Sequence, residues 1–448
     1  MPDSARSSDP AVQRQLDRLT ALSPGADILG LERITALLDR VGNPHERLPP
    51  VIHVAGTNGK GSTCAFLRAA IEAAGLTTHV YSSPHLVRFN ERIRIAGSLI
   101  TDEELAPLLE EVLDVGGDIG ASFFEVTTAA AFLAFARTPA DACIIEVGLG
   151  GRLDATNVIA RPIVTGIAQL GIDHQAFLGN TAEDIAAEKA GIAKRSVPLV
   201  TMQYPPSVAA RIAQVARTVG TPLSPVGGSW FFAAENGKLA YKDAAGRIET
   251  PLPVLVGPHQ PENLALAIAL LRHQTALKIP PEAFQAAAIT ARWPARMQRL
   301  GTGELRGLLP SESELWLDGG HNEAAGNAIA GALRQIAATP SGVPHQVHLV
   351  LGMLANKDPH GLLGPIAPLA ASLTGVPTPG HEHHSAEELA QIGRELGILV
   401  TATAPDVPSA LRVIAHHADP RGMPPLVLIL GSLYLAGEVL SANDELPS

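Results

Sequence analysis

The chain has 448 residues, of which 46% are hydrophobic and 17% are charged, so we expect a folded protein of two or three domains. Its formal net charge of −11 argues against non-specific binding to nucleic acid or to an anionic membrane. There is no apolar signal core, no easily membrane-spanning run and no metal-like spacing of Cys64 and Cys143, which predicts a cytoplasmic protein with reduced cysteines.

The first half of the chain alternates short apolar runs with alanine-rich runs. This alternation predicts a mostly parallel sheet with helices on both faces. The expected strands lie at 51–54, 78–83, 142–148 and 162–170, and the expected helices at 101–113, 127–136 and 181–193. Thr101 and Glu104 have the spacing of a capping box, and Thr181 is suited to begin its helix.

The character of the chain changes at residues 222–256, where the sequence ENG predicts the turn of a hairpin. The segment 291–299 is typical of a domain boundary, and the α/β alternation restarts after it. We therefore expect an α/β protein of two domains. They are a P-loop-type N-terminal domain at 1–293 and a smaller Rossmann-like domain at 300–448, joined by a linker at 294–299.

The strongest chemical signal is the segment VIHVAGTNGKGST at 51–63. A β-branched strand runs into a glycine-rich loop and then a helical segment, which aims backbone N–H groups and a helix N-terminus at a phosphate. Lys60 would add a positive charge. The match to the P-loop pattern is not strict, because Val54 replaces its first glycine, and Gly61 follows the lysine with Ser62 one position late. The alternative is a tight turn with a solvated lysine.

Further polar residues follow expected strands, and the carboxyl ends of parallel strands face a ligand crevice. Glu146 ends an apolar strand and could hold Mg²⁺ on nucleotide phosphates; the alternatives are a helix cap or a salt bridge to Arg152. Ser83, before Pro84, could supply a hydroxyl ligand, although its spacing alone favours a serine that stabilises its own turn.

Four more residues are candidates for a site. On spacing alone, His174 is more often structural than a ligand, and Lys189 is more often a solvated surface residue. In the C-terminal half, Asp318 and His321 flank a glycine pair between an expected strand and an expected helix. This predicts residues that face the crevice between the domains, or else a simple turn with Asn322 as the helix cap.

Six motifs occur together and in order: AGTNGKGS, SSPHLVRFNERIRI, EVGLGGRLDATN, DHQAFLGNTAEDIAAEKAGI, GPHQPENLALA and LDGGHN. In this combination the chain resembles the folylpolyglutamate synthase/dihydrofolate synthase family of the Mur ligase superfamily, from about residue 28 to residue 435. The resemblance implies an ATP-dependent ligase. Such an enzyme phosphorylates a carboxylate of a pterin-containing substrate, and the amino group of L-glutamate then attacks the acyl phosphate.

The resemblance also implies roles for single residues. Lys60, Lys189 and His321 would be catalytic, and in similar proteins the counterpart of Lys189 is carbamylated by CO₂, which makes it an anion that supports a second metal ion. One or two Mg²⁺ ions would be held by Ser83, Glu146 and His174. The nucleotide would be bound, after domain closure, by Thr57, Asn58, Gly59, Lys60, Gly61, Ser62, Asn263, Arg296 and Asp318.

The substrate side resembles the bifunctional bacterial type, in which a loop similar to LGLERI covers dihydropteroate and segments similar to SFFE and LDA line the pocket. The residues so implied are Leu29, Gly30, Leu31, Glu32, Ser122, Phe123, Phe124, Glu125, Leu153, Asp154 and Ala155. We therefore expect a monomer that makes dihydrofolate from dihydropteroate and L-glutamate, and extends the glutamate chain on reduced folates.

Three alternatives stay open at this point. The chain could extend glutamate chains only, without making dihydrofolate. A Mur-type ligase for cell-wall peptides would need an extra N-terminal UDP-binding domain, and only about 50 residues precede the phosphate loop. A P-loop ATPase or switch would not need LGLERI and SFFE. The departures from the family pattern bear on chain extension rather than on ATP chemistry, and they are Ala295, Gly320, Glu323 and Tyr434.

Overall fold

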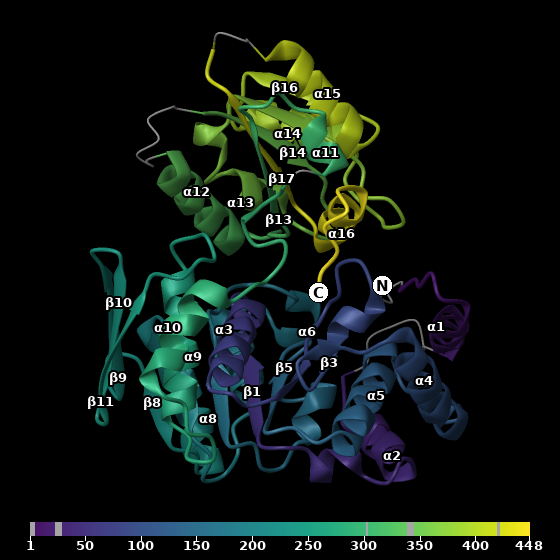
Figure 1. Cartoon of the computed structure of the whole chain (residues 1–448), viewed down its shortest axis with the longest axis vertical. Coiled ribbons are helices and arrows are strands. Elements are labelled where there is room, and N and C mark those ends of the chain that lie inside the picture. The colour runs from purple at the N-terminus through teal and green to yellow at the C-terminus, as the bar shows by residue number, and fades with distance from the viewer. Residues whose placement is uncertain (1–4, 23–28, 302, 338–344, 419–421) are drawn as a thin grey trace. The chain divides into compact units, whose positions relative to one another are not determined.

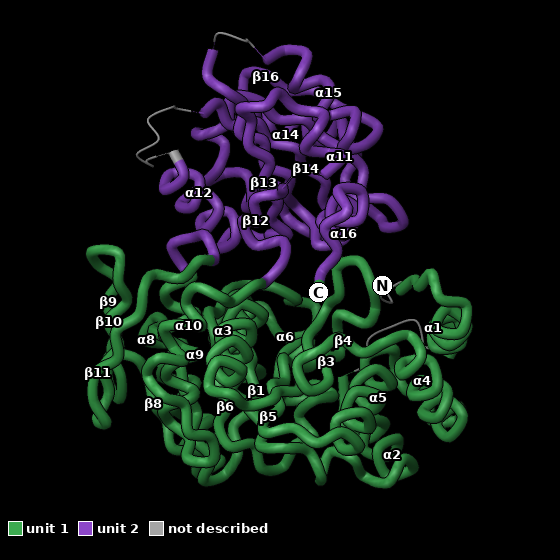
Figure 2. Tube along the Cα trace, in the orientation of Figure 1, with its two compact units in different colours: residues 1–254, 260–292, 448 green, residues 255–259, 293–447 purple. Residues whose placement is uncertain are grey.

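The computed structural model describes residues 5–22, 29–301, 303–337, 345–418 and 422–448. The chain forms two compact units (Figure 2). The first unit comprises residues 1–254, 260–292 and 448, and the second comprises residues 255–259 and 293–447. The chain thus passes between the units at residues 292 and 293, inside the segment 291–299, and also through the short stretch 255–259, which the sequence did not indicate.

The described part of the first unit contains a sheet of eight strands (Figure 1). They are β1 (Val51–Ala55), β2 (Thr78–Tyr81), β3 (Ile93–Ile95), β4 (Ser98–Leu99), β5 (Ala142–Glu146), β6 (Val164–Ile167), β7 (Leu199–Thr201) and β8 (Leu223–Pro225). Their order is β4-β3-β2-β5-β1-β6-β7-β8. All neighbours are parallel except at β3 and β4, which form an antiparallel edge. The prediction of a mostly parallel sheet is confirmed.

Helices flank this sheet. They are α1 (Pro10–Leu22), α2 (Glu32–Arg40), η1 (Pro44–Arg47), α3 (Lys60–Ala73), η2 (Phe89–Arg92), α4 (Asp102–Gly116), α5 (Phe123–Arg137), η3 (Ala155–Val158), α6 (Gln175–Leu178), α7 (Ala182–Ala190), α8 (Pro206–Val219), α9 (Gln260–Arg272) and α10 (Pro281–Thr290). The helices α1, α2, α4 and α5 share one core with side chains of β1, β2 and β5, whereas α3 packs against α9 and α10. The expected caps are confirmed at Thr101 with Glu104, and at Thr181.

A separate antiparallel sheet of the first unit contains β9 (Trp230–Glu235), β10 (Lys238–Asp243) and β11 (Gly246–Pro251). The expected hairpin is confirmed, because Asn236 and Gly237 join β9 to β10 with φ angles of 52° and 75°. Positive φ at both central residues is what a tight two-residue hairpin requires. The third strand was not predicted from the sequence.

The second unit has its own sheet and core. Its strands are β12 (Gln298–Arg299), β13 (Glu314–Asp318), β14 (Gln346–Leu351), β15 (Ser372–Gly375), β16 (Val400–Thr403) and β17 (Pro425–Leu430). Its helices are α11 (Glu304–Gly307), α12 (Glu323–Ala337), α13 (Pro359–Leu363), η4 (Ala367–Leu369), α14 (Ala386–Glu395), α15 (Val407–His417) and α16 (Leu433–Ala442). The strand order is β12-β13-β17-β14-β15-β16, and among these described strands only β12 pairs antiparallel. This is the expected second α/β unit.

Two further expectations concern buried apolar residues. The cysteines Cys64 and Cys143 are free and buried. The apolar run near the C-terminus forms the fully buried strand β17 and the helix α16. No helix in the described part of the chain is long and apolar enough to cross a membrane.

Candidate active site

The loop after β1 presents the N-terminus of α3 at the carboxyl end of a central strand. Gly59 has a φ of 82°, and α3 begins at Lys60. The first N–H groups of a helix have no partner within it and can bind an anion. The N–H groups of Thr57 and Asn58 donate to the carbonyl of Gln169 at 2.9 and 3.1 Å. They are therefore committed to the protein, and the start of α3 is the better place for a phosphate.

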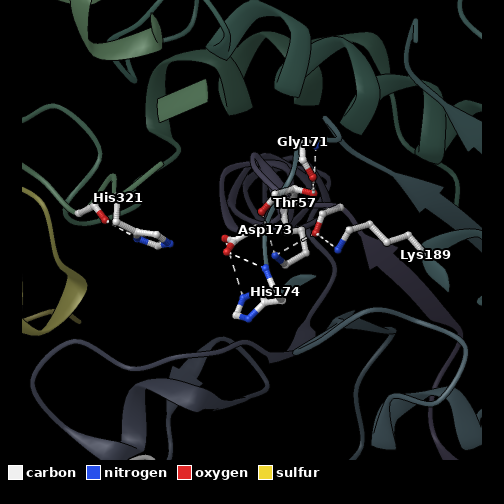
Figure 3. A network of polar contacts seen from close by, with 9 residues as sticks. Thr57, Gly171, Asp173, His174, Lys189 and His321 are labelled. Carbon is white, nitrogen blue, oxygen red and sulfur yellow. Dashed lines mark hydrogen bonds and ion pairs between the residues drawn. The ribbon is translucent and has the colours of Figure 1, made fainter. Parts of the chain in front are cut away.

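Two lysine side chains converge on one carbonyl oxygen of this loop. Lys60 Nζ lies 3.2 Å from the carbonyl oxygen of Gly56, and Lys189 Nζ from α7 donates to the same oxygen at 3.0 Å (Figure 3). Lys189 is only 4% exposed, so the spacing-based expectation of a solvated lysine is wrong. Burial, helped by the charge of Lys60, lowers the pKa of Lys189 to about 7. A large share of this lysine is therefore the uncharged amine at neutral pH.

The phosphate loop is tied to the segment that follows β6. Thr57 Oγ1 donates to the carbonyl of Gly171 at 3.0 Å and accepts the N–H of Gly171 at 3.1 Å (Figure 3). Two residues later, Asp173 Oδ1 accepts the N–H of His174 at 2.8 Å. His174 has a φ of 52° and lies just before α6, with its imidazole half-exposed. Thr57 thus fixes the segment that carries His174 to the loop after β1.

Ser83 follows β2, Glu146 is the last residue of β5, and these two strands are parallel neighbours. Tyr81 of β2 lies opposite Ile145 of β5. Ser83 therefore lies at the carboxyl end of the sheet, where Glu146 ends β5. Glu146 is 4% exposed. Arg152 pairs with Glu188 at 2.9 Å, so the expected alternative of a salt bridge from Arg152 to Glu146 is not what the structure shows.

The donor set suits a divalent ion of the magnesium type. Mg²⁺ prefers hydroxyl, carboxylate and phosphate oxygens and keeps several waters, so it rarely needs a cage made of protein alone. Ser83 and Glu146 supply such oxygens at adjacent strand ends. Within the described ranges, no three His, Cys, Asp or Glu side chains gather as a closed metal site. The residues present therefore fit an ion that shares its ligands with nucleotide phosphates.

Asp154 shapes the glycine loop that follows Glu146. Its carboxylate accepts the N–H of Leu149 at 2.8 Å and the N–H of Thr156 at 3.0 Å, and the Thr156 hydroxyl donates to it as well. The same hydroxyl is 2.8 Å from Nε2 of His53, a fully buried imidazole. Burial raises the pKa of Asp154, and these hydrogen bonds oppose the increase. The carboxylate oxygens of this expected pocket residue are thus engaged by the loop itself.

The expected pocket segment SFFE forms the start of α5. Ser122 N–H donates to Glu125 Oε2 at 2.7 Å, and Glu125 N–H donates to Ser122 Oγ at 3.3 Å, which is a capping box. Arg33 of α2 donates from Nε to the same Glu125 oxygen at 3.0 Å. This ion pair ties the segment 29–32, which leads into α2, to the first turn of α5. The Ser-x-x-Glu spacing is the signal that could have identified this box.

An aromatic side chain links the pocket segment to the glycine loop. Phe124 lies 5.8 Å from the ring of Tyr81, and a Cβ atom added at Gly148 would meet the Phe124 ring. Gly148 therefore permits a close approach that no other residue would allow. Leu153 is half-buried and Ala155 is 5% exposed at the start of η3. The expected pocket wall and the loop after Glu146 are thus in direct contact.

Asn263 of α9 lies against the phosphate loop. Its Nδ2 donates to Gln260 Oε1 at 3.1 Å, and Gln260 Nε2 lies 3.4 Å from Ser62 Oγ. A Cβ atom at Gly59 would collide with the Asn263 side chain. Asn263 is 3% exposed, so its observed contacts brace the loop that would hold the phosphates.

In the second unit, Asp318 organises the turn after β13. Its Oδ2 accepts the N–H of Met297 at 2.8 Å, and its Oδ1 accepts the N–H of Gly320 at 2.7 Å. A Cβ atom at Gly320 would lie 2.8 Å from Oδ1, so an alanine here would require the turn to shift. Ala295 has a φ of 52°. Ala295 therefore adopts a left-handed conformation that glycine would adopt at lower cost.

The remaining expected residues of the second unit surround the same turn. His321 Nδ1 lies 3.1 Å from the carbonyl oxygen of Gly319 (Figure 3). Arg296 Nη1 donates to the carbonyl of Ala295 at 2.9 Å. Asn322 Oδ1 accepts the N–H of Ala325 at 2.9 Å, which confirms that Asn322 caps α12. The cap at Asn322 therefore does not exclude the expected roles of Asp318 and His321, because all three residues belong to the same turn.

The chain is similar over most of its length to curated enzymes. It is 32% identical over 432 residues to the folylpolyglutamate synthase of Lacticaseibacillus casei, covering 91% of this chain and 92% of the relative. It is 32% identical over 425 residues to the dihydrofolate synthase/folylpolyglutamate synthase of Bacillus subtilis (strain 168), covering 92% and 94%. No protein-family model matches the chain.

Solved structures give the same result for the whole fold. FolC of E. coli, in complex with DHPP and ADP, has a TM-score of 0.85 and 30% identity, and the match covers 98% of each chain. A bifunctional folylpolyglutamate synthase/dihydrofolate synthase with Mn, AMPPNP and L-glutamate bound has a TM-score of 0.83 and 31% identity, covering 98% of this chain and 99% of the other. Both likenesses extend over the two units described above.

Proposed function

Because the chain belongs to the folylpolyglutamate synthase/dihydrofolate synthase family, we propose that it is an ATP-dependent ligase that joins L-glutamate to dihydropteroate, giving dihydrofolate. It also extends the glutamate chain on reduced folates. The observation that carries the proposal is the convergence of Lys60 and Lys189 on one loop carbonyl at the start of α3. A switch or a simple ATPase would not need, in addition, the expected substrate segment SFFE, whose Phe124 lies against Gly148.

The chemistry explains why these groups lie together. A free carboxylate is a poor acyl donor, so ATP first converts it into an acyl phosphate, and the amino group of L-glutamate then displaces phosphate to form the amide. Catalysis of phosphoryl transfer is mainly positioning and charge stabilisation. The start of α3 and Lys60 would bind the phosphates. Mg²⁺ held by Ser83 and Glu146, with His174 toward a second ion, would neutralise charge on the transferring group.

Lys189 has the properties that carbamylation requires. Only an uncharged amine reacts with CO₂, and burial keeps much of Lys189 uncharged near pH 7. The carbamate would place a negative charge beside Lys60, because both lysine side chains reach the carbonyl oxygen of Gly56. We propose this modification for Lys189, and His321 as a further catalytic residue.

The remaining roles follow the same reasoning. The nucleotide contacts are Thr57, Asn58, Gly59, Lys60, Gly61, Ser62, Asn263, Arg296 and Asp318. The dihydropteroate contacts are Leu29, Gly30, Leu31, Glu32, Ser122, Phe123, Phe124, Glu125, Leu153, Asp154 and Ala155. Thr57, Asn58 and Asp154 are also bonded within the protein, so part of their role would be to position the loops that carry them. We further propose that the enzyme works as a cytoplasmic monomer on small-molecule substrates.

The deciding experiment measures ADP release by the purified protein with MgATP and L-glutamate, with and without 7,8-dihydropteroate, and identifies products by mass. We expect ADP release that depends on dihydropteroate and a product with the mass of dihydrofolate. Stimulation by tetrahydrofolate alone would leave a chain-extending enzyme and remove the dihydropteroate role of Leu29 to Glu32. Failure of both substrates to couple ADP release to an amide would overturn the ligase proposal.

A further inference from the structure

Glu91 of η2 binds three successive backbone N–H groups of the loop that leaves β2. Its Oε2 accepts the N–H of Leu86 at 2.7 Å, and its Oε1 accepts the N–H groups of Val87 and Arg88 at 3.0 and 2.7 Å. Hydrogen bonds to a carboxylate are stronger than neutral ones, and successive N–H groups turned onto one anion define a compact loop. The same loop carries Ser83.

The start of this loop is anchored by the neighbouring residue. The N–H of Ser82 donates to the carbonyl of Arg92 at 3.1 Å. Nε of Arg92 also donates to Nδ1 of His85 at 2.8 Å. Arg92 is 1% exposed, and its guanidinium lies 5.4 Å from the centre of the Phe123 ring. Ser83 therefore lies between Ser82, which is bonded to Arg92, and Leu86, which is bonded to Glu91.

We propose that Glu91 is a positioning residue for divalent-metal binding, and that it acts by fixing the loop that carries Ser83 after β2, the parallel neighbour of the strand that Glu146 ends. The inference rests on the proposed function only through the assignment of Ser83 as a metal ligand. A purely structural carboxylate would stabilise the fold without affecting metal affinity. Residues that orient a metal ligand typically change metal affinity by about 10- to 100-fold when they are replaced.

The test replaces Glu91 by Gln, which keeps the size of the side chain. The amide oxygen can still accept N–H groups, but the amide nitrogen then faces a backbone N–H donor and the loop loses at least one hydrogen bond. The probe is Mn²⁺ titrated in the presence of AMPPNP, with free Mn²⁺ measured by electron paramagnetic resonance. We expect E91Q to bind Mn²⁺ about 10-fold more weakly. The affinity for AMPPNP without metal should not change.

Glu104 offers a matched control. Its carboxylate accepts the backbone N–H of Thr101 at 3.0 Å in an exposed capping box at the start of α4. E104Q should therefore leave Mn²⁺ binding unchanged. If E91Q lowers the melting temperature and binds Mn²⁺ as the wild type does, Glu91 is only structural and the proposal is overturned.

A double variant shows whether Glu91 acts through Ser83. We expect S83A to weaken Mn²⁺ binding, and S83A/E91Q to bind no more weakly than S83A alone. Additive losses in the double variant, or an S83A variant with normal Mn²⁺ affinity, would overturn the inference. The proposed function is tested separately, because dihydropteroate-dependent ADP release by the wild type can fail while the Mn²⁺ results stand.

Discussion

Each unit has an acidic residue at the end of a buried parallel strand, followed by glycines. Glu146 of the first unit is 4% exposed and Asp318 of the second is 6% exposed. The two acids are nevertheless used differently. Asp318 accepts two backbone N–H groups and so builds its own turn. In the first unit this task falls to Asp154, which accepts the N–H groups of Leu149 and Thr156.

The difference teaches that one sequence pattern can serve two purposes. The first unit separates the strand-end acid from the acid that supports the loop, whereas the second unit places loop support on the strand-end acid itself. A change at Glu146 should therefore act more on chemistry than on the shape of the loop that follows it. A change at Asp318 should disturb the turn before it disturbs anything else. The following predictions test this division.

The largest expected effect is on activity at Glu146. Glu146→Gln removes the negative charge proposed to hold the metal, and we expect dihydropteroate-dependent ADP release to fall about 10²- to 10³-fold. The melting temperature should change little, because Asp154 still supports the loop. Both quantities are measured on the same preparation. A variant that unfolds as readily as Asp154→Asn would show that the two acids do not divide their tasks.

The second prediction concerns Lys189, the buried lysine of the first unit. The pKa of Lys189 is lowered from 10.5 to about 7 by burial. Between these pH values the unfolded chain carries a proton that the native protein lacks, so stability rises with pH, by at most about 1.4 kcal/mol per pH unit. Below pH 7 both states are protonated and this dependence ends. Lys189→Met should abolish it.

The measurement is urea unfolding at pH 7, 8 and 9 in CO₂-free buffer, which keeps Lys189 unmodified. Lys238→Met serves as the control, because the Lys238 side chain is 69% exposed and should keep its ordinary pKa in both states. An unchanged pH dependence in the Lys189 variant would mean that this lysine is charged in the folded protein.

The third prediction compares the two acids that support loops. In Asp154→Asn and in Asp318→Asn, an amide nitrogen would face backbone N–H donors, which should cost about 1–3 kcal/mol of stability in each unit. Asp406→Asn is the matched control, because this exposed aspartate caps α15 and asparagine caps a helix equally well. Equal stability of the Asp318 variant and the wild type would contradict the role of Asp318 in its turn.

The sequence predicted those features that depend on local order in the chain. The glycine loop with Lys60, the alternation of strands and helices, the hairpin at Asn236 and Gly237, and the cap at Thr181 all follow from residues close to one another. The strand-end position of Glu146 also follows from its own strand. Family resemblance then supplied roles that spacing alone could not.

Features made by distant segments could not be predicted from local spacing. Lys189 is buried, and its Nζ donates to the carbonyl of Gly56, 133 positions away in the chain, which no local pattern indicates. Asp154 can support the loop after Glu146 only when that loop is folded. The ion pair of Arg33 with Glu125 joins two helices through residues that are 92 positions apart. These contacts depend on the tertiary fold, which a linear pattern does not contain.

The smallest expected effect distinguishes the two ends of α5. Arg33 pairs with Glu125 at the N-terminal end, where the side chains are 23% and 5% exposed, whereas Arg137 pairs with Glu111 at the C-terminal end, where they are 52% and 41% exposed. Arg33→Met should raise the KM for dihydropteroate about fivefold, which corresponds to about 1 kcal/mol, because the segment 29–32 is released from α5. The KM for ATP should stay the same.

Arg137→Met breaks the exposed ion pair between Arg137 of α5 and Glu111 of α4, which is worth about 0–1 kcal/mol of stability. This change should leave both KM values unchanged. Initial rates at varied dihydropteroate and fixed saturating ATP separate the two variants. An equal rise of both KM values in Arg33→Met would indicate a general loosening of the first unit. The pocket wall would then depend on the same contacts as the phosphate loop, and the division of tasks seen between Glu146 and Asp154 would not extend to the substrate side.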